Sequence, residues 1–425
     1  MDAPAPHTAA SFATQLTPPA AATPTGQAGK STRARRRALM SLFLGATLVL
    51  SACGGGGDAH LDEIRNPQLL RENEVLGEKA RASVNESLVG VVYASQHESA
   101  EKLDLASAGR TSLQGGGTLL GDEPFQLASM FKAMTAALAA QLVQQGKLRW
   151  DSTPAELQPE VAATQDPAYA QATLAQLLDH RSGLPAMQDP SVLSELLPLL
   201  AAEPAPLPQS DPGRRRLLAR WMLSLAPEGR PGQDFVYSNA GSTVAGAMLE
   251  AATGQDFETL LSQWARPLGM DPQWRTPARA PQGHEGAAPT QLMATQTLPA
   301  EWQPWMDAIQ PAGDVWLTPA GYGRWLAEHQ RALQGKGHGL PPAYVQRLRN
   351  LKPGEYALVW QGSQIQGHGA LVHSGADKGF MGLVLLRQDG KQAFFALSNT
   401  LGVSADGGSW VLDSLNRRLL QLATR

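Results

Sequence analysis

Strand-like patterns occur at both ends of this chain, and a long helical stretch separates them. The apolar run at 88–94 predicts a buried strand, and further short strands are expected within 102–125. From about 150 to 310 the pattern is helical and rich in prolines and loops. Strands return beyond 311, at 356–360, 369–372, 382–387 and 393–397. This order predicts one mixed α/β domain built from both ends of the chain, with an α-helical domain inserted in it.

Besides the helix that is expected to begin at Ser129 and to stop at Gly146, four helices can be placed from apolar spacing and end signals. A polar helix is expected at 68–83, and a final amphipathic helix at 409–422. Two more are expected at 242–253 and 257–268, separated by Gly254, a residue type that commonly ends helices. No internal repeat is visible in the sequence.

The expected domain runs from 68 to 425, with 68–149 and 311–425 as its α/β part and 150–310 as the helical insert. The 425 residues, 43% of them apolar, can fill ordinary cores. The net charge of −3 is small, and the dense basic run at 33–37 lies in the leader, so no nucleic-acid partner is expected.

Cofactor and metal sites are not indicated either. A single cysteine rules out a disulfide within the chain and any cysteine-based metal cluster. No His-x-His or His-Glu-x-x-His pattern occurs, and no glycine loop lies between a strand and a helix where it could hold a phosphate. We therefore expect no cofactor and no metal.

The first 52 residues read as a disordered leader followed by an export signal. Residues 1–30 are rich in Ala, Pro, Thr and Gln, and an arginine run precedes the apolar segment 38–50, which is short for a membrane span. Leu50-Ser51-Ala52-Cys53 resembles the bacterial lipoprotein box, in which the cysteine is acylated. The alternatives are a plain signal peptide cut nearby or a buried core helix. The long stretch before the arginines is consistent with a mis-set start, and Arg36-Arg37 loosely matches a twin-arginine signal.

On the lipoprotein interpretation, Cys53 is the lipidation site and 53–67, which begins with four glycines after Cys53, is a flexible tether. The protein would then be lipid-anchored in the cell envelope and would face the periplasm, on the outer membrane rather than the inner one. We expect a monomer whose partners are the membrane lipid and a small-molecule or peptide substrate.

Ser129 and Lys132 are three residues apart at a predicted helix start, so they share one face. The first helical turn carries free N–H groups and the positive end of the helix dipole, which disfavour an ammonium. A lysine held there can take the serine proton, and nearby amides can stabilise an oxyanion. The motif alone is more typical of an N-capping serine followed by a solvated lysine one turn later.

Two further patterns carry candidate chemistry. Tyr237 and Asn239 are two apart just before a helix, where a phenol can relay a proton and a carboxamide can donate and accept hydrogen bonds. His373, Ser374 and Gly375 follow an apolar run and combine a titratable ring, a hydroxyl and a glycine that permits close backbone approach. Taken singly, each pattern has a structural explanation.

Taken together and in this order, the patterns resemble the penicillin-recognising serine hydrolases of the class C β-lactamase type. The resemblance covers about 70–422 and extends to segments that lie between the three motifs. Similar segments are Gln145-Gly146-Lys147-Leu148, Leu177-Leu178-Asp179-His180-Arg181-Ser182-Gly183-Leu184, Arg266-Pro267-Leu268-Gly269-Met270, Ala312-Gly313-Asp314-Val315 and Leu397-Ser398-Asn399. It implies an α/β (α+β type) fold, with a mixed, mainly antiparallel sheet flanked by helices and an all-α domain, and the site between the two parts.

The resemblance also implies a role for each matching residue. Ser129 would be the acylated nucleophile, Lys132 its proton partner and Tyr237 the general base or acid. The substrate would contact Asn239 and the strand residues His373, Ser374, Gly375 and Ala376, with the amides of Ser129 and Ala376 as the oxyanion hole. Ionising a tyrosine at pH 7 costs about 4 kcal/mol from its reference pKa. A cationic Lys132 would lower that cost, and the sequence leaves open which of the two holds the proton.

Position 373 departs from the β-lactamase pattern, which usually has lysine there. Histidine is mostly neutral at pH 7, so a site for a substrate carboxylate loses a fixed cation unless Lys378 or Arg181 supplies one. If protonated His373 bound the carboxylate, turnover of an acidic substrate would rise towards low pH. His180 and His368 fit the family pattern as structural residues.

The sequence thus predicts a serine hydrolase that acts through an acyl-enzyme on an ester, amide or D-amino-acid peptide bond. A D-alanyl-D-alanine carboxypeptidase or weak β-lactamase is the alternative within that class. A non-catalytic peptidoglycan-binding lipoprotein is the alternative from another class.

Overall fold

The computed structural model describes most of the chain beyond the leader. The described ranges are 67–96, 102–188, 192–203, 206–296, 300–337, 339–404 and 407–424. The predicted signal segment, Cys53 and the tether up to residue 66 lie outside these ranges.

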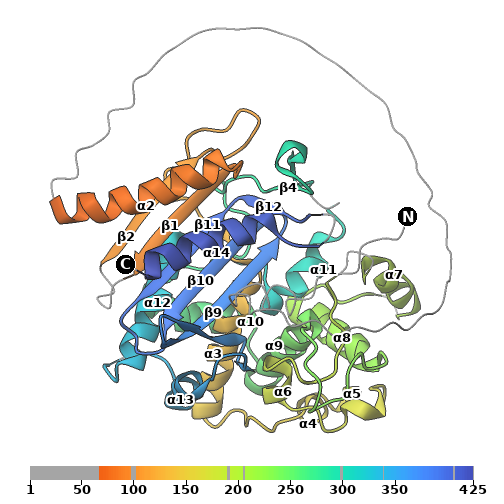
Figure 1. Cartoon of the computed structure of the whole chain (residues 1–425). Helices are drawn as coiled ribbons and strands as arrows, with labels where there is room; N and C mark the ends of the chain where they lie inside the picture. The colour runs from red at the N-terminus through yellow and green to blue at the C-terminus, as the bar shows by residue number, and fades with distance from the viewer. Residues whose placement is uncertain are drawn as a thin grey trace, which may run out of the picture.

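A seven-stranded antiparallel sheet forms the centre of the α/β part, in the order β2-β1-β11-β10-β9-β8-β7. The N-terminal strand β1 lies beside the C-terminal strand β11, with Val91 opposite Ser398. The two ends of the chain therefore build one sheet (Figure 1), and the predicted fold class is confirmed. Its strands are β1 (Gly90–Gln96), β2 (Leu103–Gly109), β7 (Tyr356–Ala357), β8 (Trp360–Ile365), β9 (His368–Asp377), β10 (Phe380–Arg387) and β11 (Ala393–Ser398).

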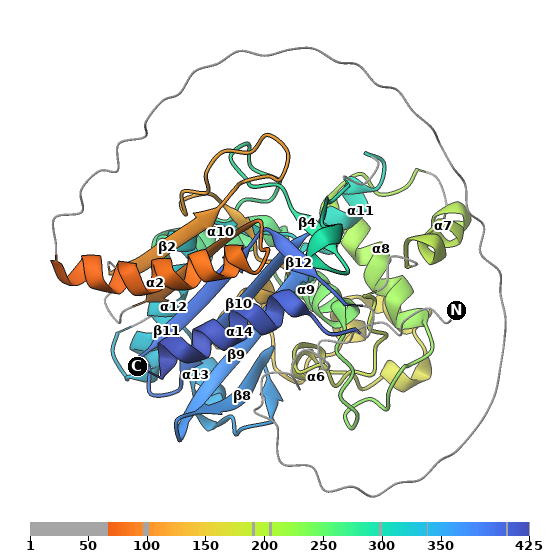
Figure 2. The ribbon, with the colours of Figure 1, turned by 45° about the horizontal axis from the view of Figure 1, so that its top comes forward.

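Helices cover both faces of this sheet. On one face lie α2 (Pro67–Asn85) and α14 (Trp410–Ala423), side by side in Figures 1 and 2. The buried side of α14 presents Leu415 and Leu419, four residues apart, to Leu383 and Leu385 of β10. On the other face lie α3 (Lys132–Gln144), α12 (Pro319–Leu333) and α13 (Pro342–Asn350), which share a larger core with the helical part.

The helical part gathers at one end of the sheet, below and to its right in Figure 1. Two of its helices start with well-formed caps, because Ser238 accepts from Gly241 N and Asp256 accepts from Thr259 N. Its members are α4 (Pro154–Leu157), α5 (Pro159–Ala162), η2 (Pro167–Tyr169), α6 (Leu174–Leu178), α7 (Val192–Ala202), α8 (Asp211–Ser224), α9 (Asn239–Thr253), α10 (Phe257–Ala265), η3 (Arg266–Leu268) and α11 (Gln303–Ala308).

The predicted helices are present with small shifts at their ends. Gly254 ends α9 in the left-handed conformation, with φ +69°, as its position predicts. The helix begins three residues earlier than predicted, at Asn239, because Ser238 caps it. The segment predicted as 257–268 is α10 followed by one 3₁₀ turn, because the chain continues into Pro267.

Two strand predictions are wrong in extent. The segment 356–360 is not one strand, because Leu358 and Val359 have φ of +48° and +63° and form the turn between β7 and β8. Asp179 holds that turn by accepting the Leu358 N–H at 2.8 Å. The strand predicted to end at 372 continues to Asp377, because β10 pairs with β9 along its whole length. The His373 motif therefore lies inside a strand.

Short strands that the sequence pattern did not indicate lie near the end of the helical stretch. β4 (His284–Gly286) pairs with β5 (Met293–Ala294) and, in parallel, with β12 (Thr400–Gly402). A second small pair joins β3 (Phe125–Gln126) to β6 (Trp316–Leu317). Across the described ranges, no helix combines the length and apolar character needed to cross a membrane.

Candidate active site

Ser129 lies in a tight 3₁₀ turn, η1 (Ala128–Phe131), between β3 and the start of α3. The turn is held by two backbone bonds, from Leu127 N to Val315 O at 2.9 Å and from Met130 N to Leu127 O at 3.1 Å. Ala128 has φ +48°, a conformation that costs an L-residue about 1–2 kcal/mol. The fold therefore fixes the serine on a strained turn rather than on a regular helical turn.

Lys132 is the first residue of α3, and its side chain is fully buried. Its Nζ lies 2.9 Å from Ser129 Oγ and also donates to the backbone oxygen of Ala312. Burial lowers the pKa of Lys132 to about 7, against the opposing effect of the Asp377 carboxylate. Near neutral pH a large share of the lysine is therefore uncharged and able to accept a proton.

Tyr237 reaches the same serine from the loop that precedes α9. Its hydroxyl donates to Ser129 Oγ at 2.7 Å, and the residue is buried. Burial raises the pKa of the phenol, and the hydrogen bond with Ser129 lowers it by less. Burial therefore favours the neutral form of the phenol, and it also favours the uncharged amine of Lys132.

The strand β9 packs its backbone directly against the nucleophile turn. A methyl group placed on Gly375 would lie 2.4 Å from Leu127 O, 2.8 Å from Met130 N and 3.0 Å from Ser129 N. Only glycine permits this approach. The register with β8 ends at Val372 opposite Gln361, so the following residues of β9 face the turn instead of a strand on that side.

His373 lies on the same face of β9 as Gly375, because side chains alternate along a strand. Both of its ring nitrogens are buried without a hydrogen-bond partner among the described residues. Burial lowers its pKa to about 3, with a further contribution from Lys132. The ring is therefore neutral far below pH 7, so low pH above about 4 is not expected to create a cation for a substrate carboxylate. Ser374 alternates to the opposite face, with Val372 and Ala376.

Asn239 begins α9, two residues after Tyr237. Its side-chain N–H donates to Met187 O at 2.9 Å, and its backbone N–H donates to Ala186 O at 2.9 Å. It therefore ties the 186–188 segment to the loop that carries the phenol. The residue is half-buried, so the carboxamide is still open to a substrate contact.

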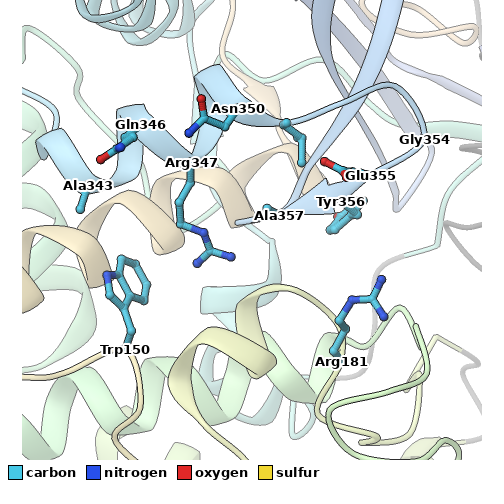
Figure 3. Close-up of a pocket in the computed structure, with 11 residues that line it drawn as sticks. Trp150, Arg181, Ala343, Gln346, Arg347, Asn350, Gly354, Glu355, Tyr356 and Ala357 are labelled. Carbon is cyan, nitrogen blue, oxygen red and sulfur yellow. The ribbon is translucent and has the colours of Figure 1, made fainter.

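The two side chains that the sequence offers as replacement cations are both engaged elsewhere. Lys378 pairs with Asp314 at 2.7 Å. Arg181 donates to Gln233 O at 2.8 Å and lines a groove of about 700 Å³ with Trp150, Arg347 and Tyr356 (Figure 3). Ser129, Lys132 and Tyr237 are not among the residues that line this groove. Neither Lys378 nor Arg181 therefore supplies an evident fixed cation for a substrate carboxylate beside Ser129.

A polar cluster beneath the nucleophile turn was missed by the sequence patterns. Gln126 donates to Asp314 at 2.7 Å and to Asp377 at 3.3 Å, and Lys378 completes the network. Burial raises the pKa of Asp377 to about 6. The only sequence signal for this cluster was its closeness to residues already singled out. Asp377 follows Ala376 directly, and Asp314 lies in one of the segments that resemble the family. Within the described ranges, no group of three or more His, Cys, Asp or Glu side chains is placed to hold a metal ion.

An antiparallel sheet flanked by helices, with serine, buried lysine and tyrosine joined beside one inner strand, defines the architecture of the penicillin-recognising proteins. A family model described as Beta-lactamase matches residues 81–414. The chain therefore belongs to the Beta-lactamase family, which confirms the resemblance found in the sequence.

Individual relatives are distant. The chain is 31% identical over 140 residues to the putative fimbrial assembly protein FimD, serogroup D, of Dichelobacter nodosus, covering 33% of this chain and 32% of that protein. It is 27% identical over 214 residues to penicillin-binding protein 4 of Amycolatopsis lactamdurans, covering 49% and 51%. The chain thus spans about a third to a half of the length of these curated relatives.

Among solved structures, the D-amino acid amidase from Ochrobactrum anthropi SV3, complexed with L-phenylalanine amide, is similar with a TM-score of 0.66 at 19% identity. The match covers 83% of this chain and 98% of that one. At this identity the likeness concerns the fold.

Proposed function

We propose that this protein is a serine hydrolase that forms an acyl-enzyme on Ser129. The observation that carries the proposal is the pair of short contacts to Ser129 Oγ, 2.9 Å from Lys132 Nζ and 2.7 Å from the Tyr237 hydroxyl. A nucleophile that is hydrogen-bonded to an amine that can lose its charge near neutral pH, and to a neutral phenol, has both a base and an acid within reach. Membership of the Beta-lactamase family supports the same chemistry.

The geometry suggests how the protons move. Uncharged Lys132 accepts the Ser129 proton while Oγ attacks the carbonyl carbon, and the oxyanion that forms is held by the N–H groups of Ser129 and Ala376. The bond to the leaving group then breaks as the Tyr237 hydroxyl supplies a proton, which the Lys132 ammonium restores. Water then attacks the acyl group on Ser129, and the groups that gave and accepted protons during acylation exchange these roles. This step releases the acid and frees Ser129.

The substrate is proposed to be an ester, amide or D-amino-acid peptide without a carboxylate that must be charge-paired beside β9. His373 is neutral and has two unused ring nitrogens, so it can hydrogen-bond a substrate but cannot replace the lysine of typical β-lactamases. The D-amino acid amidase named above supports an amide as one substrate class.

A D-alanyl-D-alanine carboxypeptidase or weak β-lactamase is the second candidate. The match to a protein named penicillin-binding protein 4 favours it, whereas the neutral His373 disfavours it. A non-catalytic peptidoglycan-binding protein is a weaker third candidate, because a binding module has no need of a buried lysine hydrogen-bonded to a serine.

Labelling with a fluorophosphonate probe tests the hydrolase proposal. Wild-type protein should be modified and Ser129→Ala should not, because Ser129 Oγ is the attacking atom. Ser374→Ala is a matched control, since its hydroxyl is on the other face of β9 and labelling should persist. Equal labelling of wild type and Ser129→Ala would refute the proposal.

A substrate comparison separates the two candidates. Nitrophenyl butyrate, which is neutral, should be turned over more efficiently than a chromogenic cephalosporin, which carries a carboxylate. His373→Lys restores a cation and should improve the cephalosporin relative to the ester. A wild-type preference for the cephalosporin would favour the carboxypeptidase or β-lactamase candidate instead.

We further propose that Cys53 carries lipid and anchors a monomeric enzyme to the outer membrane, facing the periplasm. The lipoprotein-like box and the glycine run after Cys53 support this placement. Metabolic labelling with a fatty-acid analogue should mark the wild-type chain but not Cys53→Ser, and the variant should leave the membrane fraction. Equal labelling of both would exclude lipidation at Cys53.

A further inference from the structure

His180 lies in the core beside the catalytic tyrosine, although the sequence pattern marks it only as structural. It follows α6 and Asp179, it is fully buried, and its backbone has φ +55°. A non-glycine residue in this conformation is uncommon and is kept only where the surroundings hold it. The surroundings here are the loop that carries Tyr237.

Two hydrogen bonds join His180 to the residues on either side of Tyr237. The Val236 N–H donates to His180 O at 2.9 Å, and the Ser238 N–H donates to His180 Nδ1 at 3.2 Å. One residue therefore holds the backbone immediately before and after the phenol. The His180 and Tyr237 ring centroids are also 4.3 Å apart, with the planes tilted by 44°.

The bond from Ser238 fixes the state of the imidazole. Because Nδ1 accepts a hydrogen bond, it carries no proton, so the neutral ring has its proton on Nε2. Protonation would turn Nδ1 into a donor facing another donor. The titratable groups around the ring are Lys132 of α3 and His373 of β9, which both lower the pKa of His180 after burial, and the phenols of Tyr237 and Tyr356.

The far side of the ring is closed by aromatic side chains. Tyr356 of β7 lies 5.4 Å from His180 between ring centroids, and Phe235 lies 6.0 Å away. Tyr356 also lines the groove of Figure 3. The imidazole therefore has little room to rotate away from Ser238.

We propose that His180 is the positioning residue for Tyr237: its Nδ1 and its backbone oxygen together hold the phenol on Ser129 Oγ. This inference rests on the proposed hydrolase function, because positioning is measured through acyl transfer. A displacement of the phenol by about 1 Å would be enough to slow the reaction by roughly 100-fold.

Two replacements separate the acceptor from the ring. Asparagine tolerates positive φ and offers an oxygen near the position of Nδ1, whereas phenylalanine keeps a ring and lacks the acceptor. Per active site titrated with a fluorophosphonate, we expect His180→Phe to lower kcat for nitrophenyl butyrate roughly 10- to 100-fold with little change in KM. His180→Asn should retain kcat within a few-fold, as a rescue by the variant that keeps the acceptor.

His329 supplies the matched control. It is also buried, and its ring contacts Trp325 O at 3.0 Å and Tyr344 OH at 3.0 Å. His329→Phe should lower Tm without lowering kcat per titrated site. Unchanged kcat in His180→Phe, or equal losses in His180→Phe and His180→Asn, would overturn the proposal.

A measurement on wild-type protein covers the case in which the Phe variant does not fold or no substrate is turned over. Histidine ¹⁵N NMR should show His180 as the neutral form protonated on Nε2 between pH 5 and 8. A proton on Nδ1 would overturn the positioning role. Absence of all turnover and labelling in wild type, with the Nε2–H form present, would refute the hydrolase proposal. It would leave intact the inference that His180 holds the backbone on both sides of Tyr237.

Discussion

Lys132 shows how burial can lower the pKa of an ordinary lysine to about 7. Its side chain is fully buried, near the imidazoles of His180 and His373 and the phenol of Tyr237, and the Asp377 carboxylate opposes the loss of charge. The balance brings its pKa to about 7. The uncharged form, which can take the Ser129 proton, therefore increases as pH rises through neutrality.

The pH dependence of an Asp377 variant tests this balance. Above pH 6 the Asp377 carboxylate is mostly ionised and favours the cationic form of Lys132, so its removal should lower the lysine pKa. For a neutral ester, kcat/KM should rise with pH through about 7 in wild type. Asp377→Asn should move this rising limb of the pH profile of kcat/KM to lower pH by roughly half a unit or more, given the Coulomb energy of a nearby charge.

The comparison is made with Asp122→Asn, whose exposed carboxylate pairs with Arg279 on the surface. That variant should leave the limb in place. A limb that moves to higher pH in Asp377→Asn would contradict the proposed charge balance around Lys132.

At this scale the sequence predicts the reacting residues but not their states. The order of the three patterns, together with their resemblance to a known family, was enough to name Ser129, Lys132 and Tyr237, which the structure joins by hydrogen bonds. The burial of His373, the contacts of His180 and the pKa of Lys132 come from segments far apart in the chain. No local pattern can encode them.

The strand β9 is the element that connects the sheet to the nucleophile turn. Gly375 lets its backbone lie against Ser129, and two tight hairpins fix its ends, with Gln366-Gly367 before it and Lys378-Gly379 after it. All four of these hairpin residues have positive φ, which suits the twist of the flanking strands.

A methyl group on Gly375 should separate β9 from the turn. Because the group would lie 2.4 Å from a backbone oxygen, Gly375→Ala must push the strand and the nucleophile apart. We expect kcat for ester hydrolysis to fall by roughly 100-fold or more. Stopped-flow acylation measures this directly, and a variant with wild-type acylation would show that β9 does not form part of the site.

Gly367→Ala tests the hairpin without touching the site. Its φ is +79° and a methyl group there meets no atom within 4 Å, so the whole effect is on the backbone. We expect a loss of about 1 kcal/mol in the free energy of unfolding and unchanged kcat. Gly117→Ala, with equal space and no left-handed φ, should be nearly neutral in denaturant titrations, and an equal loss there would contradict the assignment.

Elements with strong periodic patterns were predicted well, and those fixed by tertiary contacts were not. The helix ending at Gly254 and the inner strands β10 and β11 could be read directly from the sequence. The turn at Leu358 and Val359 could not, since 356–360 is a continuous apolar run without a typical turn residue and the turn depends on Asp179 from the other part of the fold.

At the scale of the whole molecule, the helical part depends on a buried ion pair. Arg215 of α8 is fully buried and pairs with Glu250 of α9. The same arginine donates to Ala308 O at 2.8 Å, and Glu250 accepts the Phe257 N–H at 2.9 Å. Three helices and the end of α11 thus share one charged centre.

Removing one partner of this pair should be costly. Glu250→Leu leaves a buried guanidinium without its carboxylate, and we expect a loss of about 3–5 kcal/mol in the free energy of unfolding. The double variant Arg215→Met with Glu250→Leu should recover part of it. Asp151→Ala breaks the exposed pair with Arg149 and should cost less than about 1 kcal/mol in the same urea titration. Equal costs for the buried and exposed pairs would contradict this.

The most direct test of acyl transfer through Ser129 is the mass of the protein during turnover. Wild type is mixed with nitrophenyl butyrate at pH 8, quenched in acid within the first turnover and analysed by intact-mass and peptide mass spectrometry. We predict one butyryl group on the peptide that contains Ser129, and its loss in Ser129→Ala. Hydrolysis that continues in Ser129→Ala, or a butyryl group on another residue, would contradict the proposed chemistry.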